Sequence, residues 1–132
     1  MVIVDANIVL RYVLDDHADL SPRAAEILEH QSVTLPLEAA CEVVYVLQKV
    51  YNIGREQIHH YLSELVNENL VHIEKSDVFL KALECYSMTT FDFVDTLLLA
   101  YHVVEHHEVL SFDEKLCKQI KRIDTEAEKT AA

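Results

Sequence analysis

Short apolar runs alternate along the chain with longer stretches in which apolar residues recur at helical spacing. The short runs are rich in β-branched residues and are predicted to be strands covered on both faces. They span residues 2–4, 32–35, 70–73 and 109–113, with a weaker fifth run at 122–124. The helical stretches span residues 7–14, 21–30, 37–52, 55–67, 77–87, 90–107 and 115–120. This alternation predicts an α/β fold of three α/β/α layers, with a parallel sheet of four or five strands.

Individual residues indicate two helix boundaries. Ser21 followed by Pro22 is a typical helix start, with the serine as N-cap. Gly54, the only glycine, is predicted to end the preceding helix in a left-handed conformation. A chain with one glycine lacks the glycine-rich loops of P-loop and Rossmann nucleotide-binding proteins, so both classes are excluded. The length of 132 residues predicts one domain over 1–125 and a frayed tail over 126–132.

The charge balance limits the classes of partner. There are 11 Lys and Arg against 23 Asp and Glu, a net charge of −12, which argues against non-specific coating of nucleic acid. It is compatible with a nucleic-acid enzyme, because divalent metal ions need clustered carboxylates. Four cations, at Lys115, Lys118, Lys121 and Arg122, form either a solvated helix face or a local guide for a polyanion.

The cysteines and the N-terminus indicate the compartment. Cys41, Cys85 and Cys117 are odd in number and widely spaced, which is typical of free thiols in a reducing cytosol. The chain shows no apolar signal core and no apolar run long enough for a membrane span. We therefore expect a cytoplasmic protein that does not enter a membrane.

Acidic residues recur where the predicted strands end and where the predicted helices begin. Asp5 and Asp113 follow the first and fourth strands, and Glu42 lies in the second turn of a helix. Asp92 and Asp95 are three residues apart near the start of the long helix and therefore share a face. The carboxyl ends of parallel strands meet at one edge, so these acids are expected to converge there. Such a cluster is costly unless a cation occupies it, and oxygen donors favour Mg²⁺ or Mn²⁺.

Other interpretations of these residues remain open. Asp5, Asp92 and Asp113 each stand where a helix N-cap is expected. Glu42 has no capping role, because it lies inside an apolar helical run. His102 and His106, four residues apart, have the spacing of a zinc-binding pair, but exposed histidines near a helix C-terminus explain them better.

The sequence around the acids resembles the PIN-domain nucleases, and within them the VapC-type toxin ribonucleases of prokaryotic toxin–antitoxin pairs. The similarity covers nearly the whole chain and rests on four segments: Val4-Asp5-Ala6-Asn7, Glu42 within Ala-Cys-Glu-Val-Val, Asp95 within Phe93 to Ala100, and Leu110-Ser111-Phe112-Asp113. Thr96 stands where the family usually has alanine, and Ser111 where it often has threonine. The resemblance implies a metal-dependent endoribonuclease that forms homodimers and is neutralised by a small antitoxin.

The resemblance also implies a role for each site residue. Asp5, Asp95 and Asp113 would bind Mg²⁺ or Mn²⁺, and Glu42 would bind the ion or orient the attacking water. Asp92 is a possible additional ligand. Three polar residues would contact substrate or nearby water, namely Asn7, Thr96 and Ser111. Arg11 would contact a phosphate or form a surface ion pair.

Three other functions also use acidic residues at the ends of strands or the same fold. A haloacid-dehalogenase-type phosphatase needs a second aspartate two residues after the first, and Asn7 stands there. A receiver domain needs an aspartate on the third strand, and residues 70–73 contain none. A PIN-like fold that binds protein or RNA without catalysis remains the alternative.

Overall fold

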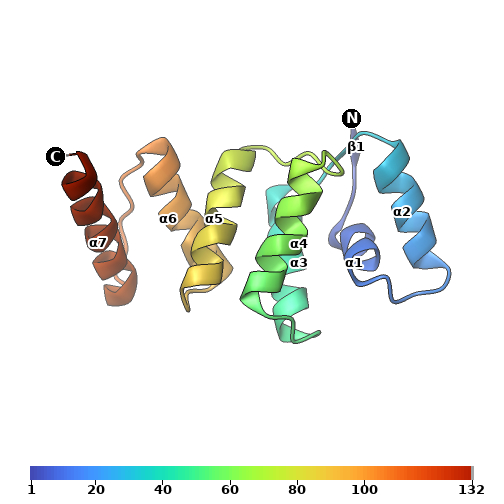
Figure 1. Cartoon of the computed structure of the whole chain (residues 1–132), viewed down its shortest axis with the longest axis horizontal. Coiled ribbons are helices and arrows are strands. Elements are labelled where there is room, and N and C mark those ends of the chain that lie inside the picture. Colours follow the sequence, from blue (N-terminus) through green and yellow to red (C-terminus); the bar gives the residue numbers. More distant parts are fainter. Residues whose placement is uncertain (132) are drawn as a thin grey trace.

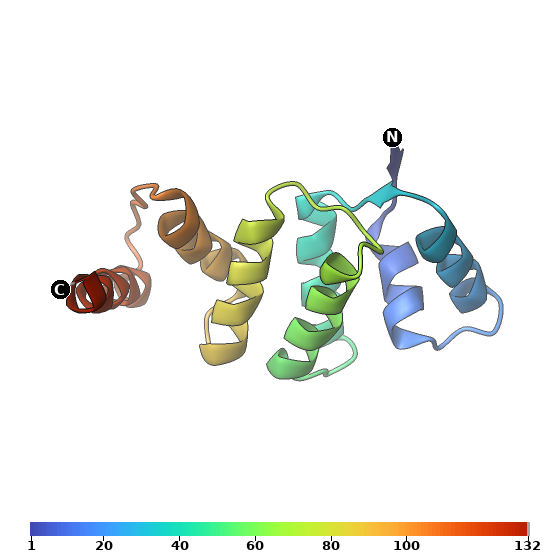
Figure 2. The ribbon, with the colours of Figure 1, turned by 45° about the horizontal axis from the view of Figure 1, so that its top comes forward.

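The computed structural model describes residues 1–131 as a row of helices with a short parallel sheet (Figure 1). The elements in chain order are β1 (Val2–Ile3), α1 (Ala6–Leu14), α2 (Leu20–His30), β2 (Val33–Thr34), α3 (Leu37–Lys49), α4 (Arg55–Asn67), α5 (Ser76–Met88), α6 (Phe93–Glu105) and α7 (Glu114–Ala131). In two views α1 and α2 lie toward one end of the row and α7 lies at the other (Figures 1 and 2). No helix among these residues is both long enough and apolar enough to cross a membrane.

The sheet is parallel but smaller than the sequence predicts. β1 pairs with β2, with Val2 opposite Val33 and Ile3 opposite Thr34. The predicted third strand, 70–73, contributes a single bridge, in which His72 donates to the carbonyl of Val33 at 2.8 Å and accepts from the amide of Leu35 at 2.8 Å. Within residues 1–131, β1 and β2 are the only strands longer than one bridge, so four or five strands are not formed.

Two of the predicted strands are wrong in this structure. Residues 109–113 form an irregular connection between α6 and α7 and pair with no strand among residues 1–131. Residues 122–124 lie inside α7, which continues through the predicted tail as far as Ala131, while residue 132 lies outside the described residues. The sequence of α7 is rich in Lys, Glu, Gln and Ala, whose strong helix propensity favours a continuous helix over a short β-branched strand.

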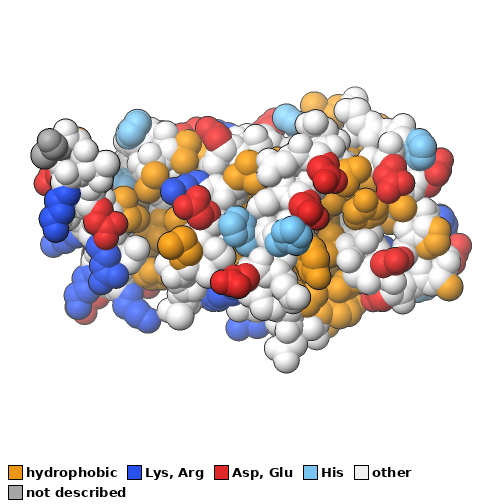
Figure 3. Space-filling view, in the orientation of Figure 1, with side chains coloured by type: hydrophobic (Ala, Val, Ile, Leu, Met, Phe, Trp, Pro, Cys, Tyr) orange, Lys and Arg blue, Asp and Glu red, His pale blue; other side chains and the backbone are white. Residues whose placement is uncertain are grey.

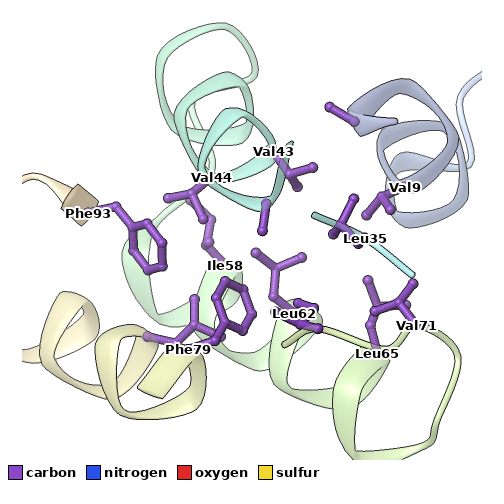
Figure 4. Packing of buried hydrophobic residues seen from close by; sticks show 14 of the residues in the cluster. Val9, Leu35, Val43, Val44, Ile58, Leu62, Leu65, Val71, Phe79 and Phe93 are labelled. Atoms are coloured by element: carbon purple, nitrogen blue, oxygen red, sulfur yellow. The ribbon is translucent and has the colours of Figure 1, made fainter. Parts of the chain in front are cut away.

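The core lies where α3, α4 and α5 meet the sheet. Figure 4 shows Val43 and Val44 of α3 packing over Ile58 of α4, with Phe79 of α5 and Phe93 of α6 beside them. All five side chains are buried. α7 lies outside this cluster, packs on α6, and buries Leu116 alone. The middle of the chain is therefore the stable body, and α7 is attached to it through α6.

Both helix boundaries assigned to single residues differ from the prediction. Gly54 has φ −69° and precedes the first residue of α4, while Asn52, at φ 58°, is the residue in the left-handed conformation after α3. Asparagine tolerates this conformation because its short side-chain amide can form a hydrogen bond with the nearby backbone. α2 begins at Leu20, and the buried Ser21 hydroxyl instead accepts a hydrogen bond from the amide of His17 at 3.1 Å.

One histidine holds α7 against α6. His102 Nε2 lies 2.7 Å from Oδ1 of Asp124 on α7, and its Nδ1 lies 2.8 Å from the carbonyl of His107. The Asp124 carboxylate and then the His107 carbonyl raise the pKa of His102 above its usual value of 6.5. The protonated imidazole is thus the form that docks α7 most tightly.

We expect the docking of α7 to weaken with rising pH. A raised histidine pKa stabilises the folded state fully below the unfolded pKa, about 6.5, and that stability is lost as pH rises through the folded value. Because Asp124 is more than half exposed, the contribution is at most about 1 kcal/mol. Hydrogen exchange of α7 amides, corrected for intrinsic pH dependence, should be slower at pH 6 than at pH 8.5. A His102→Gln variant should lose this difference, and an equal difference in the variant would contradict the assignment.

Candidate active site

Three acidic side chains lie close to one another at the start of α6 and α7. Asp92 stands at the N-cap of α6 and Asp95 in its first turn. Burial, and then the negative charges of Asp92 and Asp113, raise the pKa of Asp95 above its usual value. The half-buried Asp95 carboxylate therefore lies within electrostatic reach of both other acids.

Asp113 is held by its own helix. Its Oδ1 accepts hydrogen bonds from the amides of Lys115 at 2.9 Å and Leu116 at 3.2 Å, so Asp113 is the N-cap of α7. The Asp113 amide donates to the Ser111 hydroxyl at 2.9 Å, which fixes the turn before the helix. Ser111 thus positions Asp113 through the backbone, and the second carboxylate oxygen of Asp113 is free of this cap.

Asp5 occupies a different part of the surface. Its Oδ1 accepts a hydrogen bond from the amide of Ile8 at 3.2 Å, so it is the N-cap of α1. It borders an open groove of about 570 Å³ between β1, α2 and α3, together with Glu38. The capping interpretation thus holds for both Asp5 and Asp113, whereas the side chain of Asp92 makes no cap hydrogen bond.

A second cavity, of about 360 Å³, lies beside Asp92 and Asp95. Tyr45, Gln48 and Lys49 of α3 line it with these two acids. Tyr45 is 61% exposed at its rim. The cavity therefore combines carboxylates, a cation and an accessible aromatic ring.

Both cavities border α3, and Glu42 lies on the same face of this helix as Glu38 of the first cavity and Tyr45 of the second. Glu38 borders the groove of Asp5, while Cys41 and Tyr45 border the cavity of Asp95. Glu42 is exposed, one helical turn after Glu38 and next to Cys41. In a single chain, Asp5 therefore borders one cavity and Asp92 and Asp95 border the other.

The carboxylates of these acids are suitable ligands for a divalent ion, but within the described part of a single chain they are not close enough together for three of them to bind the same ion. Asp5, Glu42, Asp92, Asp95 and Asp113 form no ion pair with Lys or Arg among residues 1–131, so their charges are uncompensated there. Carboxylate oxygens of this kind are the donors that Mg²⁺ and Mn²⁺ prefer. Within the same residues, however, no group of three or more His, Cys, Asp or Glu side chains is placed to hold one ion. The same result leaves His102 and His106 without a zinc site.

The remaining sequence-predicted residues have local roles in this structure. Thr96 is fully buried, and its hydroxyl donates to the carbonyl of Phe93 at 2.7 Å, so it has no surface with which to contact a substrate. Arg11 forms an ion pair with Asp16 at 2.8 Å and donates a hydrogen bond to the Tyr51 hydroxyl at 3.1 Å. Of the two roles expected for Arg11, the structure therefore shows the ion pair. Asn7 is exposed in the first turn of α1, next to the groove residue Ile8.

The sequence patterns did not indicate the importance of Arg55. Its guanidinium donates to two carbonyls of the α5–α6 connection, those of Phe91 at 2.6 Å and Thr90 at 3.3 Å, and to the carbonyl of Tyr86 in the last turn of α5 at 3.1 Å. It also lies over the Tyr86 ring, 4.1 Å from the centroid. Arg55 therefore fixes the backbone that leads into Asp92. No local signal could have shown this, because its contacts lie 31–36 residues away in the chain.

Replacing Arg55 with alanine should lower stability by about 1–3 kcal/mol, because it leaves carbonyls of this connection without their charged donor. Arg55→Lys should recover only part of this loss, because an ammonium cannot span the carbonyls as the planar guanidinium does. Urea unfolding followed by circular dichroism measures both variants. Arg23→Ala, which removes an exposed i,i+4 pair with Asp19, is the matched control and should lie within about 0.5 kcal/mol of wild type. Equal stability of the Arg55 and Arg23 variants would contradict this role.

Comparison with known proteins gives one assignment. No curated protein sequence and no solved structure shows a significant match to the chain. Its sequence matches the PIN domain family over residues 2–123, which is nearly its whole length and includes all five acids. With a parallel β1–β2 pair and carboxylates at the starts of α1, α6 and α7, the chain belongs to the PIN domain family, whose members are generally metal-dependent nucleases.

Proposed function

We propose that this protein is an endoribonuclease that hydrolyses RNA phosphodiester bonds with Mg²⁺ or Mn²⁺, and that it acts as the toxin of a toxin–antitoxin pair. The observation that carries the proposal is the placement of Asp95 within electrostatic reach of Asp92 and Asp113. Burial, and then the charges of these two acids, raises the pKa of Asp95, and none of the three has a cationic side-chain partner among the described residues. A protein keeps such repulsion where a cation or a reaction uses it.

The chain's own residues supply the rest of the site. When bound, a divalent ion lowers the pKa of a water and offsets the negative charge of the phosphodiester. Lys49 in the Asp95 cavity is a cation for a neighbouring RNA phosphate, and the exposed Tyr45 ring is a surface on which a base can stack. Lys115, Lys118, Lys121 and Arg122 on α7 extend the positive surface beyond Asp113. Figure 3 shows Lys and Arg side chains gathered toward the α7 end of the molecule.

The test is cleavage of structured RNA by the purified chain. We expect cleavage with Mg²⁺ or Mn²⁺, none after removal of the metal with EDTA, and recovery when the metal is restored. Calorimetric titration with Mn²⁺ gives a readout that does not depend on finding the right RNA. Cleavage that persists in EDTA would contradict the proposal. Absence of both cleavage and Mn²⁺ binding would favour the alternative, a PIN-like fold that binds protein or RNA without catalysis.

The toxin assignment is tested in cells. Expression of the wild-type chain should arrest growth, and expression of Asp95→Asn should not. Co-expression of the neighbouring open reading frame, the place where a small antitoxin would be encoded, should restore growth. If the wild-type chain and Asp95→Asn arrest growth equally, the arrest does not come from catalysis and the toxin proposal fails.

A further inference from the structure

The cavity beside Asp92 and Asp95 contains a polar group that the fold does not use. Tyr86 of α5 lines this cavity, and its side chain is fully buried. Among the described residues its hydroxyl has no hydrogen-bond partner, although its ring contacts both Arg55 and Phe93. A buried hydroxyl without a partner destabilises the fold. The Tyr86 hydroxyl is therefore available to a ligand that enters the cavity.

The Asp92 carboxylate lies near this hydroxyl and is also free. Burial is the main cause of the raised pKa of Tyr86, Arg55 lowers it, and the charge of Asp92 raises it, so the hydroxyl lies within electrostatic reach of the carboxylate. The exposed Asp92 side chain makes no cap hydrogen bond and no ion pair with Lys or Arg among residues 1–131. The cavity thus presents two acceptor oxygens and one hydroxyl donor close together.

The size and the walls of the cavity suit a planar ring. Its volume of about 360 Å³ lies at the lower end of the range for small-ligand pockets, about 300–1,000 Å³. Val44 and Phe93, two apolar residues of its wall, belong to the buried core cluster (Figure 4). At the rim, the exposed Tyr45 ring offers a face for stacking, and Lys49 offers a cation for an attached phosphate. These features are typical of a site for one nucleobase of an RNA chain.

The net charge of the chain also favours recognition of a base. A protein with a net charge of −12 gains little affinity from the phosphate backbone of RNA alone. Contacts with a base avoid this repulsion, and they also select the sequence. A base can enter the cavity only when it is unpaired, because in a duplex its hydrogen-bonding edge is occupied and its faces are stacked. The cavity therefore favours a single strand or a loop of structured RNA.

Guanine is the base whose edge best matches these groups. Its Watson–Crick edge carries two adjacent N–H donors, at N1 and N2, and the acceptor O6 beside them. One carboxylate can accept from both donors in the bidentate geometry that makes charge-assisted hydrogen bonds strong, and a hydroxyl can donate to O6. Adenine, cytosine and uracil each place only one N–H donor group on this edge, so one carboxylate oxygen would stay unpaired.

We propose that the cavity between α3, α5 and the start of α6 binds one unpaired guanine of the RNA, with Asp92 accepting from N1 and N2 and the Tyr86 hydroxyl donating to O6. This inference rests on the proposed function and gives it a sequence preference. Asp92 selects the base, while Asp95, which lines the same cavity, remains the acid for the divalent ion. The guanine then lies beside the phosphodiester that is cleaved.

Binding of the base is tested without cleavage. Metal-free, isotope-labelled protein is titrated in EDTA with guanosine, adenosine, cytidine and uridine, and the amide chemical shifts are followed by NMR. Guanosine should bind at least about 10-fold more tightly than the other three nucleosides, and the shifted amides should lie in residues 41–49 and 86–95. Asp92→Asn should lose the preference, because its amide group opposes the guanine donors. Equal binding of the four nucleosides, no binding of guanosine, or shifts elsewhere would overturn the proposal.

Tyr86→Phe separates recognition from folding. It removes only a hydroxyl that has no partner among the described residues, so urea unfolding should show a stability at least equal to that of wild type. Guanosine affinity should fall by about 3- to 10-fold, because one hydrogen bond is lost. Tyr61→Phe is the matched control, since Tyr61 borders a different cavity, and it should leave guanosine affinity unchanged. A Tyr86 variant less stable than the control, or one with unchanged affinity, would overturn the role of Tyr86.

Cleavage gives an independent check. Sites cut in a random RNA pool should share an unpaired guanine at a fixed position beside the scissile bond, and cut sites without a shared base would overturn the proposal. If guanosine binds as expected but the protein cleaves no RNA, the proposed function fails and the guanine site stands. RNA cleavage without guanosine binding would give the reverse result.

Discussion

Asp95→Asn is expected to lower the rate of RNA cleavage at least about 100-fold, the largest effect of any single change in this protein. Asp95 lies within electrostatic reach of both Asp92 and Asp113, and burial, followed by the charges of these two acids, raises its pKa. An asparagine of the same shape keeps the fold but removes the charge that a divalent ion needs. Initial rates of RNA cleavage at saturating Mn²⁺ measure the loss of catalysis, and calorimetric titration with Mn²⁺ measures the loss of metal binding.

The matched control is Asp19→Asn, which removes an exposed carboxylate that lines neither of the two cavities and should leave cleavage unchanged. The pH dependence gives a second check. Because the ion binds only the ionised carboxylate, cleavage should fall with decreasing pH before an ordinary aspartate, with a pKa near 3.8, would protonate. Wild-type cleavage rates and wild-type Mn²⁺ affinity in Asp95→Asn would remove Asp95 from the site.

The same raised pKa predicts an opposite effect on stability. A folded carboxylate with a raised pKa binds its proton more tightly than the unfolded chain does, so the metal-free protein gains stability as pH falls through that pKa. At neutral pH the ionised Asp95 therefore destabilises the metal-free fold. Asp95→Asn should be equally or slightly more stable, by at most about 0.5 kcal/mol. The variant thus loses activity without losing its fold.

Phe93→Ala should destabilise the protein by about 3–5 kcal/mol. Phe93 is the first residue of α6, and its ring lies edge-on to both Phe79 and Tyr86 with centroids 5.7 Å apart in each pair. Figure 4 shows Phe93 and Phe79 turned toward the core cluster. Truncation removes both aromatic contacts and leaves a cavity under the turn that carries Asp92 and Asp95. Cleavage should therefore fall together with stability.

Phe93→Leu refills part of the cavity and should lose only about 1–2 kcal/mol. Denaturant unfolding measures both variants. Comparing their m-values, the slopes of the free energy of unfolding against denaturant concentration, separates a loss of stability from a change in the unfolded state. Val94→Ala is the neighbouring control, because Val94 is 58% exposed and should tolerate truncation. Equal destabilisation by Phe93→Ala and Val94→Ala would show that the aromatic cluster does not anchor α6.

Helices and acids were predictable because their signals are local. The predicted helix over 55–67 coincides with α4, and the predicted helix over 77–87 differs from α5 by one residue at each end. The motif around Asp95 correctly indicated the family, because an acid in the first turn of an apolar helix is a pattern of neighbouring residues. Asp5 and Asp113 were correctly placed at helix starts, where their alternative capping role is also observed.

The strands were predictable only in part, because a strand is completed by a partner distant in the sequence. Residues 2–4 and 32–35 contain β1 and β2, but the equally apolar segment 109–113 has no partner within residues 1–131. Residues 122–124 are part of α7 because the helix propensity of the neighbouring residues exceeds the strand propensity of this short segment. Arg55 shows the same limit, since its bonds to the α5–α6 connection depend on the packing of α4.

The sequence by itself therefore determined the helices, the family and the identity of the acids, because periodicity, capping and motifs depend on residues close together in the chain. Only the tertiary structure decided that Asp95 lies near Asp92 and Asp113, that Asp5 borders a different cavity, and that the α6–α7 connection pairs with no strand among residues 1–131. These arrangements depend on how segments far apart in the sequence pack against one another, and no local sequence pattern contains that information.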